Sequence, residues 1–138
     1  MFKQICFFRK HPDMTMEEFL DYYENQHSTL AKRMGMKPAI PNAVLYVRRY
    51  LTPELNPITG EKHDSGYDCL MEIWWNSRED FENSQRIISS PERKPITMAD
   101  EARLFASHAN PVCSVVDYES PMGPNGEATT VEVKYAAF

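Results

Sequence analysis

The sequence lacks the features that identify several large classes of protein. Its three cysteines, Cys6, Cys69 and Cys113, are odd in number and widely spaced, so neither a disulfide framework nor a Cys-x-x-Cys metal site is predicted. No apolar run is long enough to cross a bilayer, and Lys3 and Arg9 place charges where a signal peptide would be apolar. We therefore expect a cytoplasmic protein with reduced thiols.

Glycine-rich phosphate loops and an excess of positive charge are also missing. The five glycines form no Gly-x-Gly-x-x-Gly or Walker pattern, and no His-x-x-x-His spacing indicates a metal. The net charge of −5 argues against nucleic acid and anionic membranes as partners. The 138 residues suffice for one domain, whose partner we expect to be a small molecule and whose chemistry we expect to need no cofactor.

The most informative stretch, residues 15–34, has the periodicity of one amphipathic helix. Apolar residues recur at the spacing of a single helical face, and they are Met16, Phe19, Leu20, Tyr23, Leu30 and Met34. His27 falls on the same face, four residues after Tyr23. An imidazole at such a position is either a core histidine with one satisfied hydrogen bond or part of a functional site.

The remaining patterns predict an α+β fold. Four segments have the composition of strands, namely 2–9, 43–50, 67–75 and 112–118. Ser77 is placed to cap a second helix. Thr97 is placed to cap a short third helix, whose inward residues would be Met98, Ala102 and Phe105. The resulting order is that of the ferredoxin-like split βαβ fold with an antiparallel sheet.

Two segments stand outside this pattern. Residues 51–66 form a long polar loop with two prolines and two glycines, of the kind that act as lids, bind ligands or are disordered. A linker over 120–128 precedes residues 129–135, which alternate like a strand and could add to a sheet edge. We therefore expect one domain over residues 1–118 and a C-terminal extension, with a β-arm, over residues 119–138.

Alternation in the second and third strands predicts which side chains share a face. Packed beneath the helices we expect Ala43, Leu45 and Val47. On the opposite face we expect Tyr46 and Arg48 from the second strand, with Leu70, Glu72 and Trp74 from the third. Two helices cover only one face of a four-stranded sheet, and this second face is too apolar to be left in water. A homodimer that joins two sheets around a cavity in each half is the economical solution.

These patterns together resemble the EthD-like family of dimeric α+β barrel proteins. The resemblance rests on the stretches FFRKHPDMT, MEEFLDYYENQHSTL, YDCLMEIWW with SREDF, and ADEARLF. The second stretch carries the signature, an apolar-periodic EEF followed by a tyrosine and, four residues later, by His27. The resemblance implies a cofactor-free site between sheet and helices, in which a histidine at this position acts in some relatives. Similar proteins include lactone isomerases of aromatic catabolism, enzymes acting on polyketides, and haem proteins.

The candidate catalytic residues are His27, Tyr46, Glu72 and Asp100. His27 would transfer a proton near neutral pH, and Tyr46 would donate a hydrogen bond to a developing enolate or carbonyl oxygen. Glu72 would orient the imidazole or act as a second acid–base group, unless it is simply solvated. Asp100 is either part of the site or a residue of a helix start.

The candidate substrate-binding residues are Tyr23, Arg48, Trp74 and His108. Tyr23 lies one turn from His27, and Arg48 could pair either with an anionic substrate or with Glu72 across the sheet. Trp74 offers a flat wall to a ligand or packs in a dimer core. His108 could reach the mouth of the cavity or lie exposed in a loop.

We therefore predict a cofactor-independent lyase or isomerase, of the dehydratase, decarboxylase or cyclase type. Its substrate would be an aromatic, lactone or polyketide-like carbonyl compound, and His27 would act by general acid–base catalysis. The alternative is a non-catalytic accessory or small-molecule-binding protein of a catabolic or biosynthetic pathway. A further alternative, with less support from the residues, is a haem-handling monooxygenase.

Overall fold

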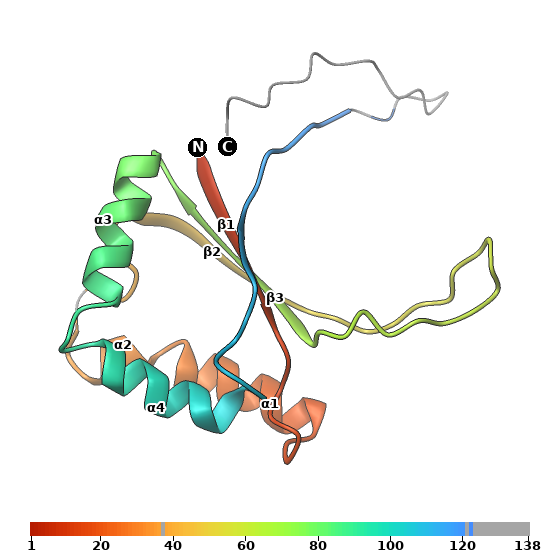
Figure 1. Cartoon of the computed structure of the whole chain (residues 1–138), viewed down its shortest axis with the longest axis horizontal. Helices are drawn as coiled ribbons and strands as arrows, with labels where there is room; N and C mark the ends of the chain where they lie inside the picture. Colours follow the sequence, from red (N-terminus) through yellow and green to blue (C-terminus); the bar gives the residue numbers. More distant parts are fainter. Residues whose placement is uncertain (37, 121, 123–138) are drawn as a thin grey trace.

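A computed structural model describes residues 1–36, 38–120 and 122 (Figure 1). The strands are β1 (Phe2–Phe8), β2 (Ala43–Tyr50), β3 (Cys69–Trp75) and β4 (Val112–Ser114). The helices are α1 (Met16–Tyr22), the π-helical turn η1 (Tyr23–His27), α2 (Leu30–Arg33), α3 (Arg78–Ile88) and α4 (Lys94–Leu104). All strand pairs are antiparallel, in the order β2-β3-β1-β4. The predicted α+β, ferredoxin-like fold is confirmed.

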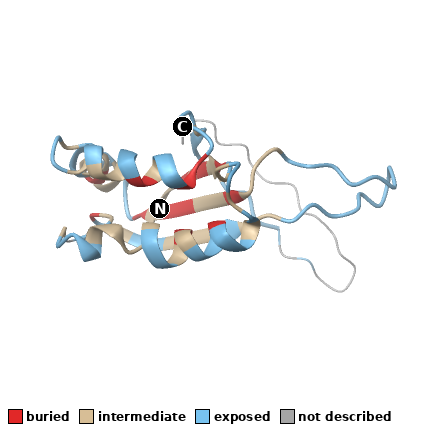
Figure 2. Cartoon of the chain, turned by 90° about the horizontal axis from the view of Figure 1, so that it is seen from below, coloured by how far each residue is buried: buried red, intermediate tan, exposed pale blue. Residues whose placement is uncertain are grey.

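The helices pack on one face of the sheet, and the core lies between these two layers (Figure 1). Figure 2 shows that the buried residues gather where helices and strands face one another. Phe8 of β1 stacks on Phe105 with ring centroids 4.1 Å apart, and Phe19 of α1 presents its ring edge-on to Tyr23 of η1. This aromatic core fixes η1 and the C-terminal end of α4 against the sheet.

A β-bulge between Ala43 and Leu45 reverses the faces expected for most of β2. Leu45 stands opposite Trp74, and Tyr46 stands opposite Ile73. Because opposed residues of antiparallel strands point to the same side, Tyr46 lies beneath the helices. The expected faces are therefore wrong for Leu45, Tyr46, Val47 and Arg48. A pattern of period two cannot reveal one inserted residue, which moves every later side chain to the other face.

The helices also differ in detail from the sequence prediction. The single helix expected over residues 15–34 is divided into α1, η1 and α2. Its predicted start is correct, because the Thr15 hydroxyl caps α1 by accepting a hydrogen bond from the Glu18 amide at 3.1 Å. Ser77 caps α3 as predicted, with 3.1 Å from its hydroxyl to the Asp80 amide. Helix α4, however, begins at Lys94 and not at Thr97. Pro95 therefore lies in its first turn, where proline is favourable because its missing N–H group needs no partner.

The earlier start of α4 changes its inward side. Met98 and Ala102 are exposed, contrary to expectation, whereas Phe105 is buried as predicted. The side that faces the sheet and η1 instead carries Thr97, Asp100, Glu101 and Leu104. These positions have the i, i+3, i+4, i+7 spacing of one helical face, but three of them are polar. A polar inward face indicates that α4 borders a site.

Segments outside the core take the following form. Strand β4 ends at Ser114, four residues earlier than expected. Residues 51–66 project away from the helices as an extension of the β2–β3 hairpin, closed by a bridge between Leu55 and Lys62 (Figure 1). The expected β-arm over 129–135 lies outside the described residues. Within the described part of the chain, no helix has the length and apolar character needed to cross a membrane.

Candidate active site

A cavity of about 220 Å³ lies between the sheet and the helices. The sheet contributes Phe8, Tyr46, Met71 and Ile73, and the segment from η1 to residue 40 contributes Tyr23, His27, Ser28, Leu30, Ala31, Met36, Ala39 and Ile40. The second wall comes from α3 and the start and middle of α4, with Ile88, Arg93, Thr97 and Glu101. A mostly apolar cavity with a few convergent polar groups is the usual form of a small-molecule site.

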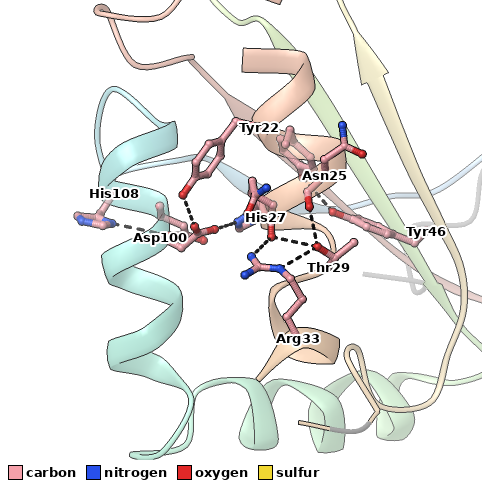
Figure 3. Close-up of polar contacts among 11 residues, drawn as sticks. Tyr22, Asn25, His27, Thr29, Arg33, Tyr46, Asp100 and His108 are labelled. Atoms are coloured by element: carbon pink, nitrogen blue, oxygen red, sulfur yellow. Dashed lines mark hydrogen bonds and ion pairs between the residues drawn. The ribbon is translucent and has the colours of Figure 1, made fainter. Parts of the chain in front are cut away.

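His27 of η1 lines this cavity and is paired with Asp100 of α4 (Figure 3). The imidazole Nδ1 lies 2.6 Å from Asp100 Oδ2, and the Tyr22 hydroxyl donates to Asp100 Oδ1 at 2.7 Å. Both side chains of the pair are largely buried, with 15% of His27 and 8% of Asp100 exposed. The two carboxylate oxygens are thus both occupied, which fixes the orientation of the imidazole.

The charge state of Asp100 determines which imidazole nitrogen is free. Burial alone would raise the pKa of Asp100, but hydrogen bonds from His27 and Tyr22 overcome it and hold the pKa below its ordinary value. An ionised carboxylate only accepts hydrogen bonds, so Nδ1 of His27 must carry the proton that faces it. In a neutral imidazole this leaves Nε2 as an acceptor, which is the state that a general base requires.

The π-helical turn explains how one segment supplies two hydrogen-bond partners to Asp100. In an α-helix, residues five apart point in different directions, because a turn contains 3.6 residues. In η1 the wider turn, with the Ser28 amide donating to the Tyr23 carbonyl at 2.8 Å, brings Tyr22 and His27 to the same side. Thr29 then donates to the Asn25 carbonyl at 2.8 Å and so satisfies a group that the irregular turn leaves open (Figure 3).

Two tyrosine hydroxyls meet beside the histidine. The Tyr46 hydroxyl donates to that of Tyr23 over 3.1 Å, and the Tyr23 ring packs edge-on against His27 with centroids 5.0 Å apart. Burial raises the pKa of both phenols, most strongly that of Tyr23. Phenols that stay protonated are suited to donate hydrogen bonds to a negative oxygen.

Helix α4 brings the carboxyl group of Glu101 into the cavity lining. Glu101 follows Asp100 directly and lines the cavity, and burial raises its pKa despite the opposing effects of His27 and His108. The His108 Nδ1 lies 3.7 Å from a Glu101 carboxylate oxygen, and the side chain of His108 is 45% exposed. The structure thus places His108 behind Glu101 at the protein surface, outside the cavity lining.

Glu72 and Trp74 lie on the face of the sheet opposite the cavity. This follows from the pairing, in which Glu72 stands opposite Val47, and Trp74 opposite Leu45. Glu72 is 7% exposed and accepts a hydrogen bond from Arg49 at 2.9 Å. The ring of Trp74 is covered by the Lys3 ammonium group, 4.0 Å from its centroid. The expectation that both residues share a face with Tyr46 is wrong.

Arg48 shares the face of Tyr46, but its charge is already paired. Its guanidinium donates through Nε to Glu24 at 3.0 Å and through a second nitrogen to the same carboxylate, and Tyr50 donates to Glu24 at 2.5 Å. The hydrogen bond from Arg48 lowers the pKa of Glu24. Burial acts in the opposite direction, and the hydrogen bond from Tyr50 adds to the lowering. Arg48 is absent from the cavity lining and joins η1 to the edge of the sheet.

Among the described residues, no three His, Cys, Asp or Glu side chains gather as metal ligands.

Four polar residues of the cavity lining are absent from the predicted site, namely Ser28, Arg93, Thr97 and Glu101. The sequence held a signal for three of them. Arg93, Thr97 and Glu101 recur every fourth residue, so they form one stripe of α4, and this stripe is polar where a core helix would be apolar. Ser28 is a lone small residue near a helix end, and nothing in the sequence distinguishes it.

Comparisons with known proteins agree with this architecture. The model of the EthD domain family matches residues 11–108. The structure is similar to the crystal structure of an ethyl tert-butyl ether D (EthD) family protein from Bacillus halodurans, with 14% identity and a TM-score of 0.53 over 86% of this chain and 100% of that one. A protein from Arabidopsis thaliana is similar at 11% identity and a TM-score of 0.54, over 88% of this chain and 99% of that one.

No curated protein matches the sequence. The two structural similarities support the fold alone, since both identities are low. The family model, by contrast, spans more than half of the chain and includes His27, Tyr46 and Asp100. This chain therefore belongs to the EthD family.

Proposed function

We propose that this protein is a cofactor-independent lyase or isomerase that moves a proton at a carbon next to a carbonyl group. The substrate would be an aromatic, lactone or polyketide-like compound. The observation that carries the proposal is the buried His27–Asp100 pair, with 2.6 Å between Nδ1 and Oδ2, in the wall of a largely apolar cavity. Such a pair presents an imidazole of fixed orientation to a ligand, and proton transfer by a placed histidine is an established source of catalysis.

The proposed reaction begins with His27 Nε2 accepting the proton of the carbon atom beside the carbonyl. The electron pair of the broken C–H bond forms a C=C bond, and the π pair of the carbonyl moves to its oxygen. The enolate oxygen is stabilised by the hydroxyl cluster of Tyr46 and Tyr23, in which Tyr46 donates to Tyr23 and Tyr23 donates to the oxygen. Asp100 stabilises the imidazolium that forms. An isomerase returns the proton to a different carbon atom, whereas a lyase gives it to a departing group.

Exchange of carbon-bound hydrogen with solvent tests this proposal without knowledge of the natural substrate. The probe is 2-tetralone in deuterated water, whose loss of hydrogen beside the carbonyl is followed by proton NMR. We expect the protein to accelerate exchange well above the rate in buffer of the same pH. An exchange rate equal to that of buffer would instead favour a protein that binds its ligand without acting on it.

Replacing Tyr46 by phenylalanine should lower the exchange rate moderately, by about 10-fold, because the Tyr23 hydroxyl that donates to the enolate loses the hydrogen bond it accepts from Tyr46. Rates at saturating 2-tetralone measure the effect. Tyr67→Phe is the control, since Tyr67 lies outside the cavity lining. Equal losses in both variants would mean that the Tyr46 hydroxyl has no role in the reaction.

We also propose that two chains associate through their sheets, as the name of the superfamily implies. No helix among the described residues covers the face that bears Leu45, Val47, Leu70 and Trp74 (Figure 1). Leu45 is 42% exposed, and the others are half-buried. An apolar face of this extent favours a partner subunit.

The three free cysteines support a cytoplasmic location.

Placing a charge on this face should weaken association. Leu70→Glu is expected to raise the dissociation constant of the dimer by about tenfold or more, because an unpaired carboxylate would be buried between the two sheets. Sedimentation equilibrium measures the constant. Leu20→Glu is the matched control, since Leu20 is 42% exposed on the helical side. A wild-type protein that stays monomeric at micromolar concentration would contradict the dimer.

A further inference from the structure

We propose that the cavity takes elongated ligands with an acidic group at one end, and that Arg93 binds this group. The inference deepens the proposed function, on which it relies for the position of the reacting carbonyl beside His27. The binding of the acidic group at Arg93 does not itself depend on any reaction.

Helix α4 borders the cavity along its length. Arg93, Thr97 and Glu101 all line the cavity and are separated by four residues each. At about 1.5 Å per residue, the helix carries Arg93 about 12 Å along its axis from Glu101. Glu101 lies at the same end as His27, because it directly follows Asp100, the hydrogen-bond partner of His27. The cavity thus has a proton-transfer end and a cationic end.

The charge of Arg93 has no acidic partner among the residues that the structure describes. Its guanidinium donates to two backbone carbonyls, from Nη1 to Ala39 at 3.1 Å and from Nη2 to Pro38 at 2.9 Å. A guanidinium carries five N–H donors, so three remain after these two hydrogen bonds. The carbonyls fix the plane of the group without neutralising its charge. A fixed, uncompensated guanidinium is suited to a carboxylate, which it can bind through two parallel hydrogen bonds.

The surroundings of Arg93 strengthen this preference. Ala39, whose carbonyl accepts a hydrogen bond from Arg93, lines the cavity together with Ile40 and Ile88, and all three residues are apolar. In such surroundings a cation and an anion attract one another more strongly than in water. Met71 and Ile73 of the sheet also line the cavity and offer apolar surface to a hydrocarbon body. The geometry therefore favours an aromatic or conjugated acid over the corresponding neutral compound.

The alternative is that Arg93 only holds the segment 38–39 in place. Loss of that role would weaken the binding of charged and neutral ligands alike. The ratio between the affinity for a charged ligand and the affinity for its neutral counterpart therefore distinguishes the two roles of Arg93 better than either affinity does alone. Suitable probes are 6-acetyl-2-naphthoate and its methyl ester, which share one rigid body and differ in the charge at one end.

Isothermal titration calorimetry of both probes, on the full chain, provides the test. We expect the wild type to bind the carboxylate at least about tenfold more tightly than the ester, and Arg93→Met to reduce this ratio to near one. Arg93→Lys should retain most of the selectivity, since it retains the charge. Arg86→Met is the matched control, because Arg86 is exposed on α3 and contacts Asn83.

Several results would overturn the inference. These are a wild type that binds the ester as well as the carboxylate, a wild type that does not bind the carboxylate at millimolar concentration, and a ratio that Arg93→Met leaves unchanged. Failure of the proposed function gives a different pattern. In that case 2-tetralone does not exchange, yet the carboxylate selectivity and its dependence on Arg93 persist.

Discussion

Replacement of His27 by alanine is expected to lower the rate of 2-tetralone exchange by about 10²–10⁴-fold. The variant keeps the cavity and the hydroxyl cluster but loses the group that accepts the proton. The fold should persist, because the imidazole is at the edge of the aromatic core and is 15% exposed. Exchange rates at saturating probe, together with thermal melting, measure both effects.

His63→Ala is the control for this experiment, since the side chain of His63 is 65% exposed in the protruding hairpin. It should exchange the probe at the wild-type rate. Should His27→Ala retain the full rate, or should it unfold, the histidine is a structural residue of the core. The buried pair with Asp100 would then serve stability alone.

The second large effect is expected for Asp100→Asn, which should lower the exchange rate by about 10²-fold or more. An asparagine amide can donate to Nδ1 and so favour the tautomer whose Nε2 carries the proton, which removes the base. Asp21→Asn is the control, since Asp21 is exposed and accepts from Asn25.

The same variant makes a prediction about stability. The folded-state pKa of Asp100 lies below its ordinary value of 3.8, so its ionised form stabilises the fold at neutral pH. This contribution is lost as the pH falls from about that value through the folded-state pKa. Asp100→Asn should therefore be less stable than the wild type near neutral pH, and the two should converge in acid. Equal urea-unfolding free energies near pH 7 would contradict this account of the pair.

The sequence was informative where one local pattern determines the structure. Helical periodicity placed His27 on the inward face of its segment, and the order of strands and helices was sufficient to predict the fold. It was uninformative where one inserted residue changes the outcome. The bulge after Ala43 moves Tyr46 to the cavity face and leaves Glu72 on the other, and the extra residue in η1 places Tyr22 beside His27.

The sequence was also uninformative about contacts between residues that are far apart in the chain. The partner of His27 is 73 residues away on α4, and a start at Thr97 would have made Asp100 a residue of the first turn. Only the true start at Lys94 places Asp100 in the middle of the helix. Arg93 and Glu101 were missed for the same reason, because their role depends on which side of α4 faces the cavity. Local capping rules do not contain that information.

The most direct test of the central claim, that His27 transfers the proton, compares two titrations. One is the pH dependence of kcat/KM for 2-tetralone exchange, and the other is the NMR titration of the His27 ring in the free protein. Because kcat/KM reports the ionisation of the free enzyme, we predict that the rate rises with the same midpoint as the loss of the imidazolium. Midpoints that differ clearly, or a rate profile that persists in His27→Ala, would contradict the claim.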